Sequence, residues 1–224
     1  MIEEIIKRRN DRELGKYGRI LTDEERDEVL DRERREEEEE ARRRRIVANL
    51  EAFKVPKRFR NARFDTTECA SAKERSVIEY LKKGRSAVIY GPNGTGKTHL
   101  AFASCIHQIV EGKTAKYVLA FDLFNSIRRS FGDSTTDTLV NEFASYDYLV
   151  IDEIDKTLGT PTEFTYLYSI INARYNDMKS TVLITNATPS EFVAIIGQSA
   201  LDRVASDGAV IELSGENYRL RRDK

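Results

Sequence analysis

From about residue 85 onward, short apolar runs alternate with longer amphipathic segments. The apolar runs have the length and composition of buried strands, and they lie at 86–90, 116–120, 148–151, 180–185 and 209–213. Between them, residues 98–110, 122–131 and 164–178 carry apolar side chains at helical spacing. Strands that alternate with helices predict an α/β fold, in which a parallel five-stranded sheet is covered by helices on both faces.

Two of the expected helices carry additional signals. The helix near residues 164–178 is expected to bury six apolar residues, namely Phe164, Leu167, Ile170, Ile171, Tyr175 and Met178. Thr188 to Glu191 is expected to open another helix, because it combines a proline at the first helical position with a capping box.

The first fifty residues follow a different pattern. Thr22 and Glu25 form a capping-box signature, and nothing interrupts a helix from there to about Leu50. Between Asp31 and Arg45, 14 of 15 residues are charged, so this helix is expected to be solvated on nearly every side. Oppositely charged side chains lie four residues apart in the favourable order at Glu38 and Arg42, Glu39 and Arg43, and Glu40 and Arg44.

The segment ahead of the charged helix contains scattered apolar residues. They are Ile2, Ile5, Ile6, Leu14, Tyr17, Ile20 and Leu21. A small apolar patch on a charged strut suggests docking to a partner protein, while folding back onto the rest of the chain is an equally open alternative. With Val55 and Pro56 as the boundary, we expect a helical, highly charged arm at 1–54 and a second domain at 55–224.

Composition limits the function classes. The chain has 224 residues, 40% of them hydrophobic, and a formal net charge of −1, which gives one core and no overall nucleic-acid signature. Cys69 and Cys105 lack partners at metal-ligand spacing, which predicts a cytoplasmic protein in a reducing compartment without a zinc site. No apolar run approaches the roughly 20 residues of a membrane span, so no membrane association is expected.

The segment from residue 91 to 98 matches the phosphate-binding pattern G-x-x-x-x-G-K-[ST] at every position. Its glycines allow a tight turn that directs backbone N–H groups at phosphates, Lys97 reaches the β- and γ-phosphates, and Thr98 can ligate Mg²⁺. The expected ATP-binding residues are Gly91, Pro92, Asn93, Gly94, Thr95, Gly96, Lys97, Thr98 and His99. This segment predicts ATP and Mg²⁺ as ligands.

An acidic pair follows the apolar run that ends at Ile151. Asp152 and Glu153 would emerge at the carboxyl end of a strand buried on both faces, beside the phosphate-binding turn. Asp152 is expected to share the Mg²⁺ shell with Thr98. Glu153 is expected to orient or activate the water that attacks the γ-phosphate, which predicts an ATPase.

The ordered set of motifs resembles a known family. The chain resembles the bacterial and phage replicative-helicase loaders of the DnaC type in four segments and in Phe64 and Asp65 ahead of them. The segments are Ser-Ala-Val-Ile-Tyr-Gly-Pro-Asn-Gly-Thr-Gly-Lys-Thr-His-Leu-Ala, Tyr-Asp-Tyr-Leu-Val-Ile-Asp-Glu-Ile, Leu-Ile-Thr-Asn and Leu-Asp-Arg-Val. The IstB transposition ATPases are close relatives, and both belong to the P-loop AAA+ (ASCE) class. The resemblance implies a three-layer sandwich, here without a C-terminal lid.

The resemblance also nominates residues outside the phosphate-binding turn. It implies that Asn186 is the polar sensor for water and γ-phosphate, and that Arg203 is an arginine finger inserted into the ATP site of a neighbouring copy in an ATP-dependent oligomer. It further nominates four single-stranded DNA contacts, Lys116, Arg128, Arg129 and Phe131, although residues 122–131 could equally be an amphipathic helix with solvated arginines. Arg219 is a weaker candidate for a phosphate contact.

We therefore expect an ATP-dependent loader of a replicative hexameric helicase, which would engage the helicase through the arm and single-stranded DNA through the ATPase domain. A transposition helper ATPase acting on duplex DNA is the first alternative. An inactive ATP-binding adaptor is the second, and it is disfavoured because both Asp152 and Glu153 are present. The sequence departs from the family at Asp155, where glycine is frequent, and at Ala205, where some loaders carry arginine.

Overall fold

A computed structural model describes residues 22–65, 67, 72–130, 136–157, 159–215 and 217–218. The chain divides into two units, Met1–Arg45 and Ile46–Lys224. Helix α2, Asp23–Ala52, supplies residues to both units. Residues Leu50 and Phe53 pack into the core of the second unit, so the structural division precedes the expected functional boundary at residue 54, which stays a prediction.

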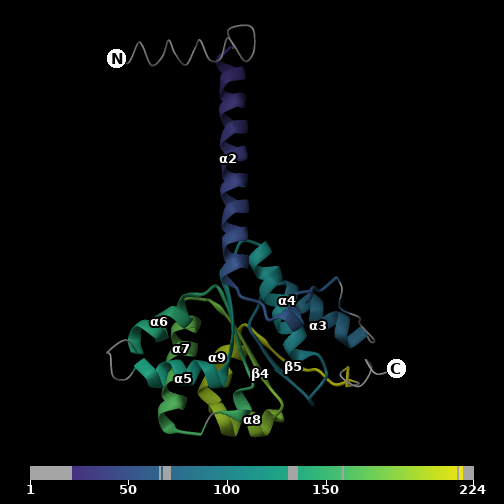
Figure 1. Ribbon diagram of the computed structural model, residues 1–224, viewed down its shortest axis with the longest axis vertical. Coiled ribbons are helices and arrows are strands. Elements are labelled where there is room, and N and C mark those ends of the chain that lie inside the picture. Colours follow the sequence, from purple (N-terminus) through teal and green to yellow (C-terminus); the bar gives the residue numbers. More distant parts are fainter. Residues whose placement is uncertain are drawn as a thin grey trace. The chain divides into compact units, whose positions relative to one another are not determined.

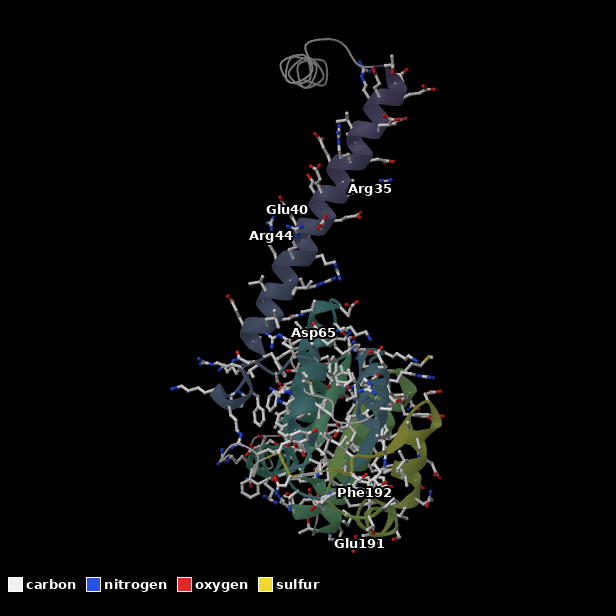
Figure 2. All side chains as sticks on the ribbon, turned by 90° about the vertical axis from the view of Figure 1, so that its right-hand side faces the viewer. Arg35, Glu40, Arg44, Asp65, Glu191 and Phe192 are labelled. Atoms are coloured by element: carbon white, nitrogen blue, oxygen red, sulfur yellow. The ribbon has the colours of Figure 1, made fainter. Side chains whose placement is uncertain are left out.

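The first unit is described from residue 22, so the apolar segment 2–21 lies outside the described residues. The expected capping box is confirmed, since the Thr22 N–H donates to Glu25 Oε2 at 2.9 Å and the Glu25 N–H donates to Thr22 Oγ1 at 3.3 Å. No residue of α2 is buried. Figure 2 shows its side chains, Arg35, Glu40 and Arg44 among them, pointing outward around the helix.

The second unit contains a sheet of five parallel strands. Their spatial order is β2-β3-β4-β1-β5. The strands are β1 (Ala87–Tyr90), β2 (Ala115–Leu119), β3 (Tyr148–Asp152), β4 (Ser180–Thr185) and β5 (Ala209–Glu212). This confirms the α/β fold with a five-stranded parallel sheet.

Helices cover both faces of this sheet (Figure 1). One face carries α3 (Ala72–Lys82) and α4 (Lys97–Val110). The other carries five helices, α5 (Ala120–Ser130), α6 (Thr136–Ser145), α7 (Pro161–Asn176), α8 (Pro189–Ile196) and α9 (Gln198–Ser206). Two short 3₁₀ segments, η1 (Lys57–Phe59) and η2 (Ile154–Lys156), complete the described elements. The result is the expected three-layer sandwich.

The central strand β3 shows why the two layers form. Tyr148 and Val150 pack with α3 and α4, whereas Leu149 and Ile151 pack with the helices of the opposite face. All five residues of β3 are buried. Successive side chains of a strand point to opposite faces, so a continuous apolar run fits a strand that is covered on both sides.

The buried stripe of α7 differs from the expectation. Leu167, Ile170 and Ile171 are buried as expected, but Phe164 is 37% exposed, Tyr175 is 45% exposed and Met178 is 89% exposed. Met178 lies beyond the end of α7 at Asn176, and its φ of 54° takes the chain away from helical geometry. The expected buried stripe is therefore longer than the observed one at both ends.

A buried arginine on α7 ties two elements of this layer together. Arg174 is fully buried, and burial lowers the pKa of its guanidinium to about 10. Its nitrogens donate at 2.5–3.2 Å to Thr181 Oγ1 and to the carbonyl oxygens of Phe143, Ala144, Tyr146 and Ser180. One side chain thus satisfies carbonyl groups at the end of α6 and at the start of β4.

Candidate nucleotide-binding site

The phosphate-binding turn, Gly91–Thr98, joins β1 to α4 at the carboxyl edge of the sheet. Gly96 has φ 89°, a left-handed conformation that glycine adopts without steric cost, and α4 begins at the next residue. A Cβ on Gly91 would lie 2.2 Å from the Leu213 carbonyl oxygen, so only glycine fits there. The first N–H groups of α4 follow directly on this turn and have no partner within the helix, which is the arrangement that binds anions.

Lys97 lies inside this turn. Its Nζ donates to the carbonyl oxygens of Gly91 at 2.6 Å and Pro92 at 2.7 Å, and the residue is only 7% exposed. These bonds hold the ammonium group against the concave side of the turn, where a phosphate would be bound. Lys97 therefore lies in the turn and lines the cavity described below, and its contact with the β- and γ-phosphates stays a prediction.

Asp152 ends β3 next to the turn. Its Oδ2 accepts from Thr98 Oγ1 at 2.9 Å and from the Tyr117 hydroxyl at 2.8 Å, and its Oδ1 accepts from the Glu153 N–H at 2.7 Å. Burial raises the pKa of the Asp152 carboxyl, and these donors only partly offset the increase. The Thr98 hydroxyl and the Asp152 carboxylate, which sequence analysis paired, are in direct contact. Both are hard oxygen donors of the kind that Mg²⁺ prefers.

Tyr117 is a site residue that sequence analysis did not identify. It lies on β2, one strand from Asp152, and burial beside that carboxylate raises the pKa of its hydroxyl far above the ordinary value. Its signal in the sequence is only a tyrosine within an apolar run. That pattern does not reveal that β2 lies beside β3 in the sheet. The contact between Tyr117 and Asp152 therefore could not be predicted without the strand order.

Glu153 stands at the point where the chain leaves β3. Its backbone has φ 58° and ψ 39°, a left-handed conformation that is uncommon for residues other than glycine, and it leads directly into η2. The Glu153 carboxylate accepts from Lys156 Nζ at 2.6 Å. A strained residue at the edge of a cavity is typical of functional sites.

Asn186 follows β4 at the same edge of the sheet. Its backbone N–H donates to Asp155 Oδ1 at 3.0 Å and its side-chain Nδ2 donates to Asp155 Oδ2 at 3.3 Å. The Thr185 hydroxyl also donates to Asp155 Oδ1, at 2.9 Å. Burial favours a higher pKa for Asp155, but these donors outweigh it and lower the pKa below its ordinary value.

These groups share one cavity of about 800 Å³, which is within the range of small-molecule sites. Predicted residues that line it are Asn93, Gly94, Thr95, Gly96, Lys97, Thr98, His99, Asp152, Glu153 and Asn186. The cavity continues toward residues that were not predicted, among them Pro56, Phe59, Glu74, Tyr117 and Tyr218. The last of these donates its N–H to the Gly94 carbonyl oxygen at 3.0 Å, which attaches the segment after β5 to the turn.

Arg203 lies elsewhere, on α9, and does not line this cavity. Its Nε donates to Asn172 Oδ1 at 2.8 Å, one terminal nitrogen donates to the Ser199 carbonyl oxygen at 2.8 Å, and its guanidinium lies 4.9 Å from the centre of the Tyr168 ring. The guanidinium is thus held by side chains of α7 and by the backbone of its own helix α9. Its role as a finger for another copy stays a prediction.

The residues expected to contact DNA differ in their surroundings. Arg128 forms an ion pair with Glu163 and a hydrogen bond with Asn125, while Arg129 is exposed on the same helix. Lys116 lies on β2 with its Nζ 5.8 Å from the centre of the Tyr146 ring. Phe131 and Arg219 lie outside the described residues.

The site combines a phosphate-binding turn after β1, an acidic pair at the end of β3 and a polar residue after β4, all at one edge of a five-stranded parallel sheet. These features define a P-loop nucleotide-binding protein. The chain belongs to the family of IstB-like ATP binding proteins, whose family model matches residues 10–224. ATP binding is the activity that this family's description states.

Two of the similar proteins carry different descriptions. An ATP-binding protein of insertion sequence IS5376 from Geobacillus stearothermophilus is 30% identical over 178 residues, which cover 75% of this chain and 70% of the relative. The replicative helicase loader DnaC of Escherichia coli strain K12 is 28% identical over 156 residues, which cover 68% of this chain and 64% of DnaC.

A solved structure supports the fold. The crystal structure of the DnaC helicase loader superposes with a TM-score of 0.62 at 20% identity, covering 71% of this chain and all of that chain. In the described part of the chain, no helix has both the length and the apolar character needed to cross a membrane.

Proposed function

We propose that this protein hydrolyses ATP in an oligomer and uses the energy to load a ring helicase onto single-stranded DNA. The observation that carries the ATPase proposal is the meeting of Lys97, Thr98, Asp152, Glu153 and Asn186 on one cavity. They come from three separate segments of the chain. A phosphate-binding turn alone would suit any nucleotide-binding protein, whereas the carboxylate pair and the polar side chain suit hydrolysis.

Each group has a defined task in this proposal. The N–H groups of the turn and the Lys97 ammonium bind the β- and γ-phosphates. Thr98 and Asp152 would hold Mg²⁺, which neutralises phosphate charge when bound. Glu153 accepts a proton from water as the water attacks the γ-phosphorus and the bond to the β-phosphate oxygen breaks. Asn186 fixes the position of that water.

Glu153 is engaged by Lys156 at 2.6 Å, so the base must release this partner before it can take a proton. The pair is partly exposed, with 49% and 42% of the two side chains accessible, and water screens such pairs strongly. Its release therefore costs little, and the engagement does not argue against Glu153 as the base.

The ATPase proposal is tested by two variants with different expected defects. Lys97→Ala removes ground-state contacts and should abolish ATP binding. Glu153→Gln removes a group needed in the transition state, and should retain ATP binding while turnover falls roughly 100-fold or more. ATP binding is measured with a fluorescent analogue and turnover by phosphate release. Equal turnover of Glu153→Gln and the wild type would contradict the assignment.

The oligomer proposal assigns Arg203 to the ATP site of a neighbouring copy, where a fixed cation stabilises the transition state. Its position outside its own cavity supports this assignment. Mixtures of Arg203→Ala and Lys97→Ala subunits should regain activity, because some interfaces then pair an intact pocket with an intact arginine. Co-assembly without any recovery, at every mixing ratio, would argue for a structural role.

The loader proposal is supported by the relative DnaC, whose name states that function. The IS5376 relative favours a second candidate, a transposition helper that acts on duplex DNA. The two are separated by comparing ATPase stimulation by single-stranded and duplex DNA, and by assaying unwinding by a replicative hexameric helicase on DNA coated with single-strand binding protein. Stimulation by duplex alone, with no helicase loading, would select the transposition helper.

A further inference from the structure

The residue Asp155 lies beside the site but has no role in the reaction as described. It reaches the end of β4 because Glu153 turns the chain out of β3 and into η2. There its carboxylate accepts three hydrogen bonds, from Thr185 Oγ1 at 2.9 Å, from the Asn186 N–H at 3.0 Å and from Asn186 Nδ2 at 3.3 Å. One short segment thus carries both the proposed base and a carboxylate that holds the proposed sensor.

The chemistry of the carboxylate decides which way the Asn186 amide points. An ionised carboxylate only accepts hydrogen bonds, so the side-chain nitrogen of Asn186, and not its oxygen, must face Asp155. Thr185 cannot orient the Asn186 amide in place of Asp155, because both hydrogen-bonding functions of its hydroxyl are used. The hydroxyl oxygen accepts from the Ala187 N–H at 3.0 Å, and the hydroxyl proton is donated to Asp155. The Asn186 oxygen is left on the opposite side of the amide.

We propose that Asp155 is a positioning residue that fixes the orientation of the Asn186 side chain, so that Asn186 Oδ1 accepts a hydrogen bond from the attacking water. Asn186 lines the cavity, which allows its free oxygen to meet that water. The inference rests on the proposed ATPase function. It adds that Asn186 acts as an acceptor for water, and that Asp155 enforces this role.

The substitution Asp155→Asn tests the proposal with little change in shape. The introduced carboxamide can still accept from Thr185 and from the Asn186 N–H, but its nitrogen would oppose Asn186 Nδ2. The Asn186 amide should therefore turn over and present its nitrogen to the water. We expect kcat to fall roughly tenfold or more, because a misdirected positioning group costs that much, while ATP affinity changes less than twofold.

A double-mutant cycle separates positioning from structural support. In an Asn186→Ala background, Asp155→Asn should change kcat less than twofold, because the amide that it orients is gone. Asp155→Gly is the second variant, in case Asp155→Asn fails to fold, and its effect should vanish in the same background. Asp207→Asn is the control, since Asp207 is an exposed aspartate outside the cavity.

Three outcomes would overturn the inference alone. The first is wild-type turnover in Asp155→Asn. The second is that the effects of the Asp155 and Asn186 substitutions on kcat multiply in the double mutant, as independent effects do. The third is a loss of ATP affinity that parallels the loss of kcat. A wild-type protein that binds ATP but does not turn it over would overturn the proposed function itself. The two failures are therefore distinguishable in one set of measurements.

Discussion

Helices α2 and α7 show how differently the two units of this chain are stabilised. Between Asp23 and Arg45, α2 buries no residue and relies on local features, a capping box and ion pairs four residues apart. By contrast, α7 buries Leu167, Ile170, Ile171 and Arg174 against the sheet. Local signals suffice to predict the first helix, whereas the second derives its stability and its tasks from residues distant in sequence.

The difference predicts that the N-terminal unit can be removed without loss of the nucleotide site. A variant lacking residues 1–45 should fold, bind ATP and retain weak, salt-sensitive binding to single-stranded DNA, while association with the helicase should be lost. Deletion through residue 50 would also remove Leu50, which packs on the core, so the cut belongs at residue 45. Pull-down and fluorescence anisotropy are the measurements.

The reciprocal variant sharpens this division. Replacing Arg128, Arg129 and Phe131 by alanine should weaken DNA binding and spare helicase capture. Because Arg128 also pairs with Glu163, Arg129→Ala alone is the cleaner probe of a DNA contact. A truncated protein that captured helicase as well as the full chain does would place the docking surface on the second unit, Ile46–Lys224.

Two arginine substitutions, one in each unit, should differ in how much they lower the free energy of unfolding. Arg174→Met removes the guanidinium that donates to the carbonyl oxygens of Phe143, Ala144, Tyr146 and Ser180, although the Ala144 oxygen keeps a longer bond from Lys179 Nζ at 3.4 Å. The loss of these bonds should lower the free energy of unfolding by about 3–4 kcal/mol. Arg43→Met removes an arginine that pairs with Glu39 on the surface of α2, and should cost less than about 0.5 kcal/mol. Urea denaturation of both variants measures the difference, and comparable losses would contradict the comparison.

Arg174 also illustrates where sequence reasoning stopped. The phosphate-binding turn and the acidic pair are local signals at strand ends, and parallel strands bring their carboxyl ends to one edge, so their common place could be predicted from the sequence. The position of Asn186 after a strand could also be predicted, but its role as a sensor was implied only by the family resemblance. An arginine in an amphipathic segment gives no sign of burial. Its partners come from α6 and β4, so only the packed structure reveals it.

Other omissions have the same cause. Helices α3, α6 and α9 were not predicted, and α9 follows α8 directly, separated by Gly197 at φ 80°. Tyr117 reaches the site because β2 lies beside β3, which the sequence alone does not reveal. Asp155 was noticed only as a departure from the family, and the three hydrogen bonds that it accepts require η2 to be placed beside β4.

The capping glutamates of α7 and α8 allow a comparison within the second unit as pH changes. Burial favours a raised pKa for Glu163, but hydrogen bonds from the Gly159 and Thr160 N–H groups and the charge of Arg128 lower the pKa overall. A lowered pKa stabilises the fold above the unfolded value, and this contribution is lost as pH falls through the folded value.

We therefore expect the difference in melting temperature between the wild type and Glu163→Gln to be large at pH 7 and to shrink between about pH 5 and pH 3. Glu191→Gln is the matched comparison, because Glu191 closes the same type of capping box on α8 but is exposed. Hydrogen bonds from Thr188 also lower the pKa of Glu191, so its difference in melting temperature should shrink in the same direction and be smaller. Differential scanning calorimetry measures both. A gap for Glu163→Gln that stays constant with pH would show that its charge does not contribute.

The smallest expected effect concerns the ion pairs of α2. Glu40→Gln removes the partner of Arg44, which Glu40 Oε2 contacts at 2.9 Å, and an exposed pair of this kind contributes about 0.3–0.5 kcal/mol. Helicity at 222 nm should fall slightly at low salt and match the wild type in about 1 M NaCl, where charges are screened. Glu37→Gln is the control, because it removes the same charge with Ala41 four residues on. The unfolding midpoint of the second unit should not move in either variant, and a shift there would show that the two units are energetically coupled.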